Sequence, residues 1–175
     1  MPPFFQDDPH PEKSLFFLLL NLNKRGVTLD LESDAGAKLF KELVQQSDIV
    51  VESFQPGYLA SLGLDYESLE RINPRIILTS ITGFGQTGPY SHFKSEEIAA
   101  YAMGQIMSVS GTTDREPLKH GGFQAQYEGG INGALATAVA ALLREFSGEG
   151  QHVDVSIQEV VNWTLVGSFP NYSWN

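Results

Sequence analysis

The chain has 175 residues, of which 42% are hydrophobic and 11% aromatic, enough for a domain with a real core and too apolar for a wholly disordered chain. Its 11 Lys and Arg residues stand against 21 Asp and Glu residues, so the formal net charge is −10. This charge repels a nucleic-acid backbone or an anionic membrane surface, and neither is expected as a partner.

The composition also excludes several kinds of site. Because the chain has no cysteine, a disulfide scaffold, a Cys-ligated metal and a thiol nucleophile are excluded. Its four histidines are dispersed without ligand spacing, so no metal site is expected. The longest apolar run, residues 15–20, is far shorter than the roughly 20 residues that span a bilayer. The acidic start lacks the basic region of a signal peptide, and we expect a cytoplasmic chain.

The first thirty residues are predicted to hold an arm and two short elements. Residues 1–13 are rich in proline and acids and predict a surface arm, because proline cannot support helix hydrogen bonding. We expect residues 14–175 to form one domain. The apolar block Ser14–Asn21 predicts a buried helix or strand, between which periodicity does not decide. Arg25–Leu31 alternates apolar and polar residues and predicts a strand.

The next stretch predicts a parallel strand–helix–strand unit. Residues 33–46 carry apolar side chains at i, i+4 spacing after a Ser-Asp start that can cap a helix. A short buried strand is predicted at 48–52. A short helix at 66–72, ended by an Asn-Pro pair, leads into the next parallel strand at 75–82. The strand at 25–31, the helix and the strand at 48–52 favour a right-handed parallel βαβ unit.

The second half begins with a glycine-rich loop, residues 83–89, directly after the strand at 75–82, and open α/β sheets place ligands at such loops. The elements that follow are a helix at 98–109, a loop at 111–122, a helix of small residues at 126–147, a strand at 151–155 and a helix that opens at Ser156. The predicted fold class is therefore α/β, with an open, mostly parallel sheet and flanking helices. A chain that starts before its first strand and ends inside a helix is interpreted as a piece of a longer protein.

Six short motifs occur in a fixed order along the chain. They are Asn23–Leu31, Val51–Gly57, Leu64–Tyr66, Asn73–Arg75, Gly83–Pro89 and Ser147–Ser156. The set resembles the family III CoA-transferases, which include formyl-CoA transferase, carnitine CoA-transferase and alpha-methylacyl-CoA racemase. The resemblance implies a Rossmann-like CoA-binding domain, incomplete relative to the family, and an interlocked homodimer or a related subunit as partner.

The resemblance also implies that coenzyme A enters as an acyl-CoA thioester substrate and is not a covalently bound cofactor. It further implies which residues contact CoA. These are Leu29, Asp30, Leu31, Glu32, Ser53, Phe54, Gln55, Lys94 and Glu97. Phe54 could stack on a base, and Lys94 could meet a phosphate as a point charge. The alternative is that Phe54 is a core residue and Lys94 a solvated charge. For Glu97, a buried structural role and a ligand role both stay open.

The chemistry of the family depends on one carboxylate. An Asp attacks the acyl-CoA thioester to give a mixed anhydride, CoA returns to form an enzyme-CoA thioester, and a carboxylic acid acceptor then takes the CoA. Counting back from Gly148 places Gly130 at the family glycine and Gln126 at the Asp. A glutamine amide cannot form the anhydride. The nearest carboxylate is Glu128.

Glu128 could replace the Asp only if the backbone there is not yet helical, because helix positions two apart diverge by about 200°. The alternative is that Glu128 is a first-turn acid that stabilises the start of the helix. The racemase branch would need His at Glu96 and Asp at Gln126, and neither is present.

Three hypotheses on function follow. The first is a CoA-transferase that moves CoA from an acyl-CoA to a carboxylic acid. The second is a non-catalytic CoA-binding or partner subunit, for which another chain supplies the Asp. The third is a fragment without activity of its own.

Overall fold

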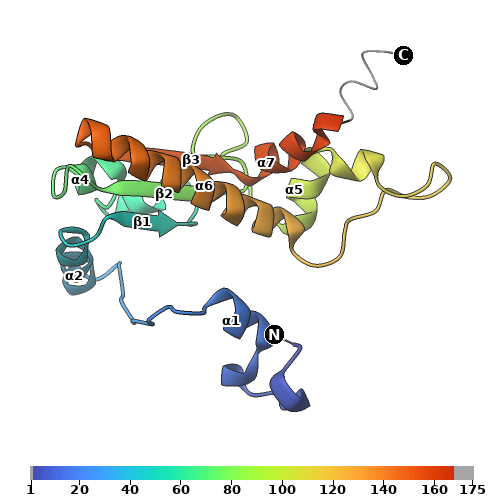
Figure 1. Cartoon of the computed structure of the whole chain (residues 1–175), viewed down its shortest axis with the longest axis horizontal. Coiled ribbons are helices and arrows are strands. Elements are labelled where there is room, and N and C mark those ends of the chain that lie inside the picture. Colours follow the sequence, from blue (N-terminus) through green and yellow to red (C-terminus); the bar gives the residue numbers. More distant parts are fainter. Residues whose placement is uncertain (1, 168–175) are drawn as a thin grey trace. The chain divides into compact units, whose positions relative to one another are not determined.

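The computed structural model describes residues 2–167. Contacts divide the chain into two units, Met1–Asp30 and Leu31–Asn175 (Figure 1). The first unit contains two 3-10 helices, η1 (Phe5–Asp7) and η2 (Pro11–Lys13), and the helix α1 (Leu15–Leu20). An isolated antiparallel bridge joins Phe4 to Ser14. This unit contains no strand of the sheet.

The apolar block of the first unit is a helix, which decides between the two predicted alternatives. The Ser14 hydroxyl accepts a hydrogen bond from the Phe17 amide at 3.3 Å and caps α1. The predicted burial is wrong, since Phe17 is 55% and Leu19 is 67% exposed. A helix of 6 residues has few neighbours within this unit against which to bury a face.

The predicted strand at residues 25–31 is also wrong, and with it the predicted βαβ unit. Residues 24–30 have no regular secondary structure. Alternation is a local pattern, whereas a strand also needs a neighbour for its backbone hydrogen bonds. Among the residues that the structure describes, none pairs with this segment to form a ladder.

The second unit is built on a parallel sheet with the order β1-β2-β3. Its strands are β1 (Ile49–Glu52), β2 (Ile77–Thr82) and β3 (Gln151–Ser156). All three predicted strands in this unit and the α/β fold class are confirmed. β2 is central and almost wholly buried, but β1 alternates between exposed and half-buried residues. The predicted full burial of β1 is wrong because it lies at an edge of the sheet.

Helices surround this sheet and account for the rest of the second unit. Their bounds are α2 (Asp34–Val44), α3 (Tyr58–Ser61), α4 (Tyr66–Glu70), α5 (Glu97–Met103), η3 (Ile106–Val109), α6 (Gln124–Ser147), α7 (Ile157–Trp163) and η4 (Thr164–Gly167). The predicted cap Ser33 and the predicted start of a helix at Ser156 are confirmed, and each serine side chain accepts a backbone N–H. The predicted helix at 98–109 is divided into α5 and η3, because Gln105 adopts a left-handed conformation with φ 68°.

The two faces of the sheet are covered by different helices. Figure 1 shows α6 running along β2 and β3. The hydroxyls of Thr79 on β2 and Thr137 on α6 are hydrogen-bonded at 2.7 Å. Because side chains alternate along a strand, Leu78 and Ser80 point to the opposite face. On that face Tyr66 of α4 stacks on His152 of β3, with ring centroids 5.8 Å apart.

Two apolar cores lie in the second unit. One is formed by Val44, Leu59, Leu64, Leu69 and Ile76, under α2, α3 and α4. The other is formed by Ala100, Tyr101, Ala125 and Val161, where α5, α6 and α7 meet. The second core fixes the start of α6 beside α5 and α7, at the carboxyl end of the sheet.

We expect Gly150→Ala to destabilise the fold strongly. A Cβ at Gly150 would lie 1.9 Å from the Ile76 carbonyl oxygen, which is backbone and cannot rotate away. We expect a loss of about 3 kcal/mol in the free energy of unfolding, the upper part of the range for overpacking. Urea denaturation measures it. The matched control is Gly130→Ala, where a Cβ meets nothing within 4 Å, with a gain of up to about 1 kcal/mol. Equal stability of the two variants would contradict this packing.

Candidate functional site

A pocket of about 650 Å³ opens where β1 and β2 end. It is bounded by the turn after β1, the segment before α5, and the starts of α5, α6 and α7. Its lining residues are Val51, Glu52, Ser53, Phe54, Gln55, Pro56, Ile81, Thr82, Gly83, Ser91, Phe93, Ser95, Glu96, Glu97, Ala100, Ala125, Gln126, Gly130 and Ile157. The carboxyl end of a parallel sheet is where open α/β folds bind their ligands.

The pocket brings together five of the residues expected from the sequence: Ser53, Phe54, Gln55, Glu97 and Gln126. The other expected residues of the second unit, Leu31, Glu32, Lys94 and Glu128, do not line it.

Leu31 packs against the core under α2 and α4, and Glu32 accepts a hydrogen bond from the Tyr58 hydroxyl at 3.2 Å. Lys94 is exposed, in the segment before α5. Leu29 and Asp30 belong to the first unit.

Phe54 lies on the wall of the pocket rather than in a core. Its side chain is 43% exposed, and its ring packs on Tyr58 with centroids 4.8 Å apart. The Glu52 carboxylate accepts the Phe54 amide hydrogen bond at 2.7 Å, which fixes the turn after β1. The structure therefore holds an apolar ring at the pocket with a second ring behind it.

Glu97 ties the start of α5 to the start of α6. The residue is only 9% exposed, and its two carboxylate oxygens accept hydrogen bonds from the amides of Ala125 at 2.9 Å and Gln126 at 3.2 Å. The residue that precedes α6, Phe123, makes no side-chain cap. A buried carboxylate on otherwise unpaired amides at a helix N-terminus is a charge-assisted cap. Glu97 thus has a structural role and also lines the pocket.

The backbone at Gln126 and Glu128 is helical, because α6 begins at Gln124. Gln126 lines the pocket, whereas Glu128, two helix positions away and rotated by about 200°, does not. The condition under which Glu128 could replace the family Asp is therefore not met. The first-turn interpretation is wrong as well, since the first turn of α6 contains no acidic residue.

Glu128 lies among other ionisable groups beside the pocket. One of its carboxylate oxygens is buried and has no hydrogen-bond partner in the part of the chain that the structure describes. Burial, followed by the negative charge of Glu97, raises the pKa of Glu128, and His120 acts in the opposite direction. Burial and the charges of Glu128 and Glu97 also raise the pKa of Tyr101. The Tyr101 hydroxyl lies 3.4 Å from His120 Nδ1.

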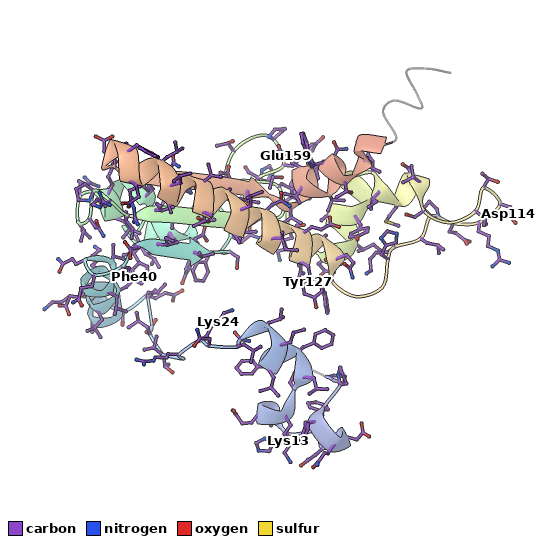
Figure 2. The ribbon with its side chains drawn as sticks, in the orientation of Figure 1. Lys13, Lys24, Phe40, Asp114, Tyr127 and Glu159 are labelled. Atoms are coloured by element: carbon purple, nitrogen blue, oxygen red, sulfur yellow. The ribbon has the colours of Figure 1, made fainter. Side chains whose placement is uncertain are left out.

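The loop at 111–122 leaves this cluster and returns to α6. Figure 2 shows Tyr127 at the start of α6 and Asp114 at the tip of the loop. Lys119 donates hydrogen bonds to the carbonyls of His120 at 2.6 Å and Gly122 at 2.8 Å. These contacts hold the end of the loop next to the first turn of α6.

Thr82 is a site residue that the sequence reasoning missed. It is the last residue of β2, is 7% exposed and lines the pocket, and its hydroxyl has no hydrogen-bond partner among the described residues. Its place between a predicted strand and the glycine-rich loop was the available signal. Phe93 also lines the pocket, and it lies in a segment without periodicity, so no pattern marked it.

Two kinds of feature are absent among the residues that the structure describes. No group of three or more His, Cys, Asp or Glu side chains is placed to hold a metal ion. No helix is long and apolar enough to cross a membrane.

We expect Glu97→Ala to loosen the start of α6, because two helix amides lose their acceptor. The loss in the free energy of unfolding should be about 1–3 kcal/mol. Hydrogen exchange at the amides of Ala125 and Gln126 should become faster, whereas the middle of α6 should be protected as before. The control is Glu96→Ala, at the exposed neighbour. Unchanged exchange at both amides would show that the cap does not form.

We expect Glu128→Gln to stabilise the chain at neutral pH. Because the pKa of Glu128 is raised, the folded chain binds more protons than the unfolded chain between the ordinary glutamate pKa and the raised one. Stability therefore falls as the pH rises through this window. The melting temperature of the variant should exceed that of the original chain at pH 7, and the gain should vanish near about pH 3.5, where the carboxyl is protonated in both states. Glu116→Gln, in the exposed loop, is the control; a gain independent of pH would contradict the assignment.

Comparisons with known proteins identify the relatives of this chain. The model of CoA-transferase family III matches residues 1–175. The chain is 38% identical to a succinate–glutarate CoA-transferase of Agrobacterium fabrum, over 98% of this chain and 43% of that protein. It is 39% identical to the beta subunit of a succinyl-CoA–L-malate CoA-transferase of Chloroflexus aurantiacus, over 85% of this chain and 37% of that protein.

A solved structure is similar over the full length of the chain. It is a CaiB/BaiF family protein from Brucella suis, with a TM-score of 0.91 and 38% identity, and the match covers 100% of this chain and 46% of that one. The chain thus spans less than half the length of these relatives. The resemblance found in the sequence motifs is confirmed, and the chain belongs to CoA-transferase family III.

Proposed function

We propose that this chain is the acyl-CoA-binding component of a CoA-transferase, in which a second, related chain supplies the carboxylate that attacks the thioester. The observation that carries the proposal is that Gln126 lines the pocket, because the sequence motifs align this residue with the family nucleophile. An amide there cannot form the acyl anhydride. The transfer of CoA to a carboxylic acid then runs through an anhydride and a CoA thioester on the second chain.

The start of α6 gives a further reason to separate binding from chemistry in this chain. Backbone N–H groups at a helix start could stabilise the oxyanion of a thioester under attack. Here the amides of Ala125 and Gln126 already donate to Glu97. This chain therefore offers no nucleophile at Gln126, and these two amides are already engaged with Glu97.

The second chain is expected to differ from this one. A homodimer would place Gln126 at the family Asp in both copies and would supply no carboxylate at that position. One of the relatives is itself named a beta subunit. A related subunit that carries the Asp therefore agrees better with the sequence than a second identical copy.

The lining of the pocket suits the neutral end of an acyl-CoA. The Thr82 hydroxyl is buried at the pocket and has no partner within residues 2–167, and a buried polar group without a partner is costly. A pantetheine amide or the thioester carbonyl would supply the missing acceptor. Lys94 lies in sequence between two lining residues, Phe93 and Ser95, and its exposed ammonium can meet a phosphate at the rim.

The first test is binding of CoA and butyryl-CoA by calorimetry, with Thr82→Val as the diagnostic variant. We expect both ligands to bind, and the variant to bind them about tenfold more weakly with no loss of folding stability, since it removes an unpaired hydroxyl. Thr79→Val is the matched control on the same strand. It breaks the 2.7 Å bond to Thr137 and should destabilise the fold. Absence of binding by the original chain would refute the proposal.

The second measurement locates the nucleophile. The chain is incubated with butyryl-CoA and a carboxylate acceptor, and its peptides are mapped by mass spectrometry. We expect no CoA thioester on any carboxylate of this chain. An adduct on Glu128 that disappears in Glu128→Ala would return the nucleophile to this chain and overturn the role of the second one.

A further inference from the structure

We infer that the pocket prefers uncharged, apolar acyl groups to acyl groups of dicarboxylic acids, which carry a second, free carboxylate. The inference rests on the proposed function, because it concerns the acyl end of an acyl-CoA in the same pocket. It is carried by two properties of the lining, the sign of its charges and the placement of its aromatic rings.

The charged residues of the lining are all acidic. Glu52, Glu96 and Glu97 line the pocket, and among its described lining residues there is no Lys, Arg or His. A second carboxylate on the acyl chain would lose hydration when it enters this partly enclosed pocket. The described lining residues would offer it three acidic side chains and no cation. Like charges brought together in this way disfavour binding. A neutral acyl chain does not meet this cost.

The apolar part of the lining is exposed and rigidly supported. Phe54 is 43% and Phe93 is 47% exposed, so a ligand can still cover both rings. Phe93 contacts three further rings, with centroid distances of 5.4 Å to Tyr90, 4.7 Å to His92 and 6.5 Å to the buried Phe84. Rings that are already held in place lose little side-chain freedom when a ligand binds.

The remainder of the lining extends this apolar surface. Val51, Ile81, Ala100 and Ile157 add aliphatic groups from β1, β2, α5 and α7. Each methylene that a ligand buries against such a surface raises affinity by about fourfold. An acyl chain of several carbons therefore gains affinity over free CoA, provided that it carries no charge.

Butyryl-CoA and succinyl-CoA form a matched pair for the test, because both acyl chains have four carbons and differ in a terminal methyl or carboxylate. Calorimetric titration of the chain should give butyryl-CoA the higher affinity, by about tenfold or more. Free CoA is expected to bind more weakly than butyryl-CoA. Equal affinities, or tighter binding of succinyl-CoA, would overturn the inference.

Three variants assign the preference to the lining. Glu96→Lys should narrow the ratio of the two affinities by favouring succinyl-CoA. Phe93→Ala should reduce the advantage of butyryl-CoA over free CoA. Phe146→Ala is the control, since Phe146 is 83% exposed and lies about 30 Å along α6 from Gln126 at 1.5 Å per residue. An unchanged ratio in Glu96→Lys would contradict the electrostatic argument.

Lys94 tests the other source of selectivity. If its ammonium meets the phosphates, Lys94→Ala weakens both acyl-CoAs equally and leaves their ratio unchanged. A selective loss of succinyl-CoA would place a cation on the acyl carboxylate and overturn the inference. The proposed function and this inference are contradicted by different results. If CoA and both thioesters fail to bind, the proposed function is wrong. If all three bind but butyryl-CoA and succinyl-CoA bind equally, only this inference is wrong.

Discussion

The close approach of α6 to the sheet is the constraint on which the second unit depends. A Cβ at Gly133 would lie 2.5 Å from the Ile81 side chain, and one at Gly129 would lie 3.6 Å from Ile81 and 2.9 Å from Ile157 at the start of α7. The hydroxyl bond between Thr79 and Thr137 continues the same contact. Small residues therefore bring the helix axis near β2, and the direction of α6 carries its first turn to the carboxyl end of the strands, where the pocket lies.

Charged side chains fix α6 at both ends, so its position along the sheet is determined as well as its distance from it. At the far end the buried guanidinium of Arg144 donates to the carbonyls of Asp48 at 3.1 Å and Arg75 at 3.2 Å, at the starts of β1 and β2. At the near end Glu97 accepts from two amides. A helix held in this way cannot rotate to exchange Gln126 for Glu128 at the pocket.

The sequence predicted those parts of the fold that depend on local pattern. The strand β2 and the helix α2, which Ser33 caps, are both present in the structure, and both were predicted from local signals: the residue pattern of the strand and the periodicity and capping residue of the helix. The segment at 25–31 has the alternation of a strand but no partner, and partners are not a local property. The cap by Glu97 joins residues 28 positions apart, and no spacing rule covers such a contact. Thr82 was identifiable as a strand end, but not as an unpaired hydroxyl.

Binding and chemistry can be separated in this fold because they depend on different residues. The pocket is formed by the ends of β1 and β2, by the aromatic rings of two loops and by the Glu97 cap, none of which involves the Gln126 side chain. That side chain is exposed and lines the pocket, so the methylene that glutamine has in addition to aspartate can project into the pocket. On the proposed function, glutamine at the position of the family Asp removes the nucleophile and leaves the buried packing of α6 unchanged. The same packing keeps Glu128 out of the pocket lining, which is why the proposed function assigns the attacking carboxylate to a second chain.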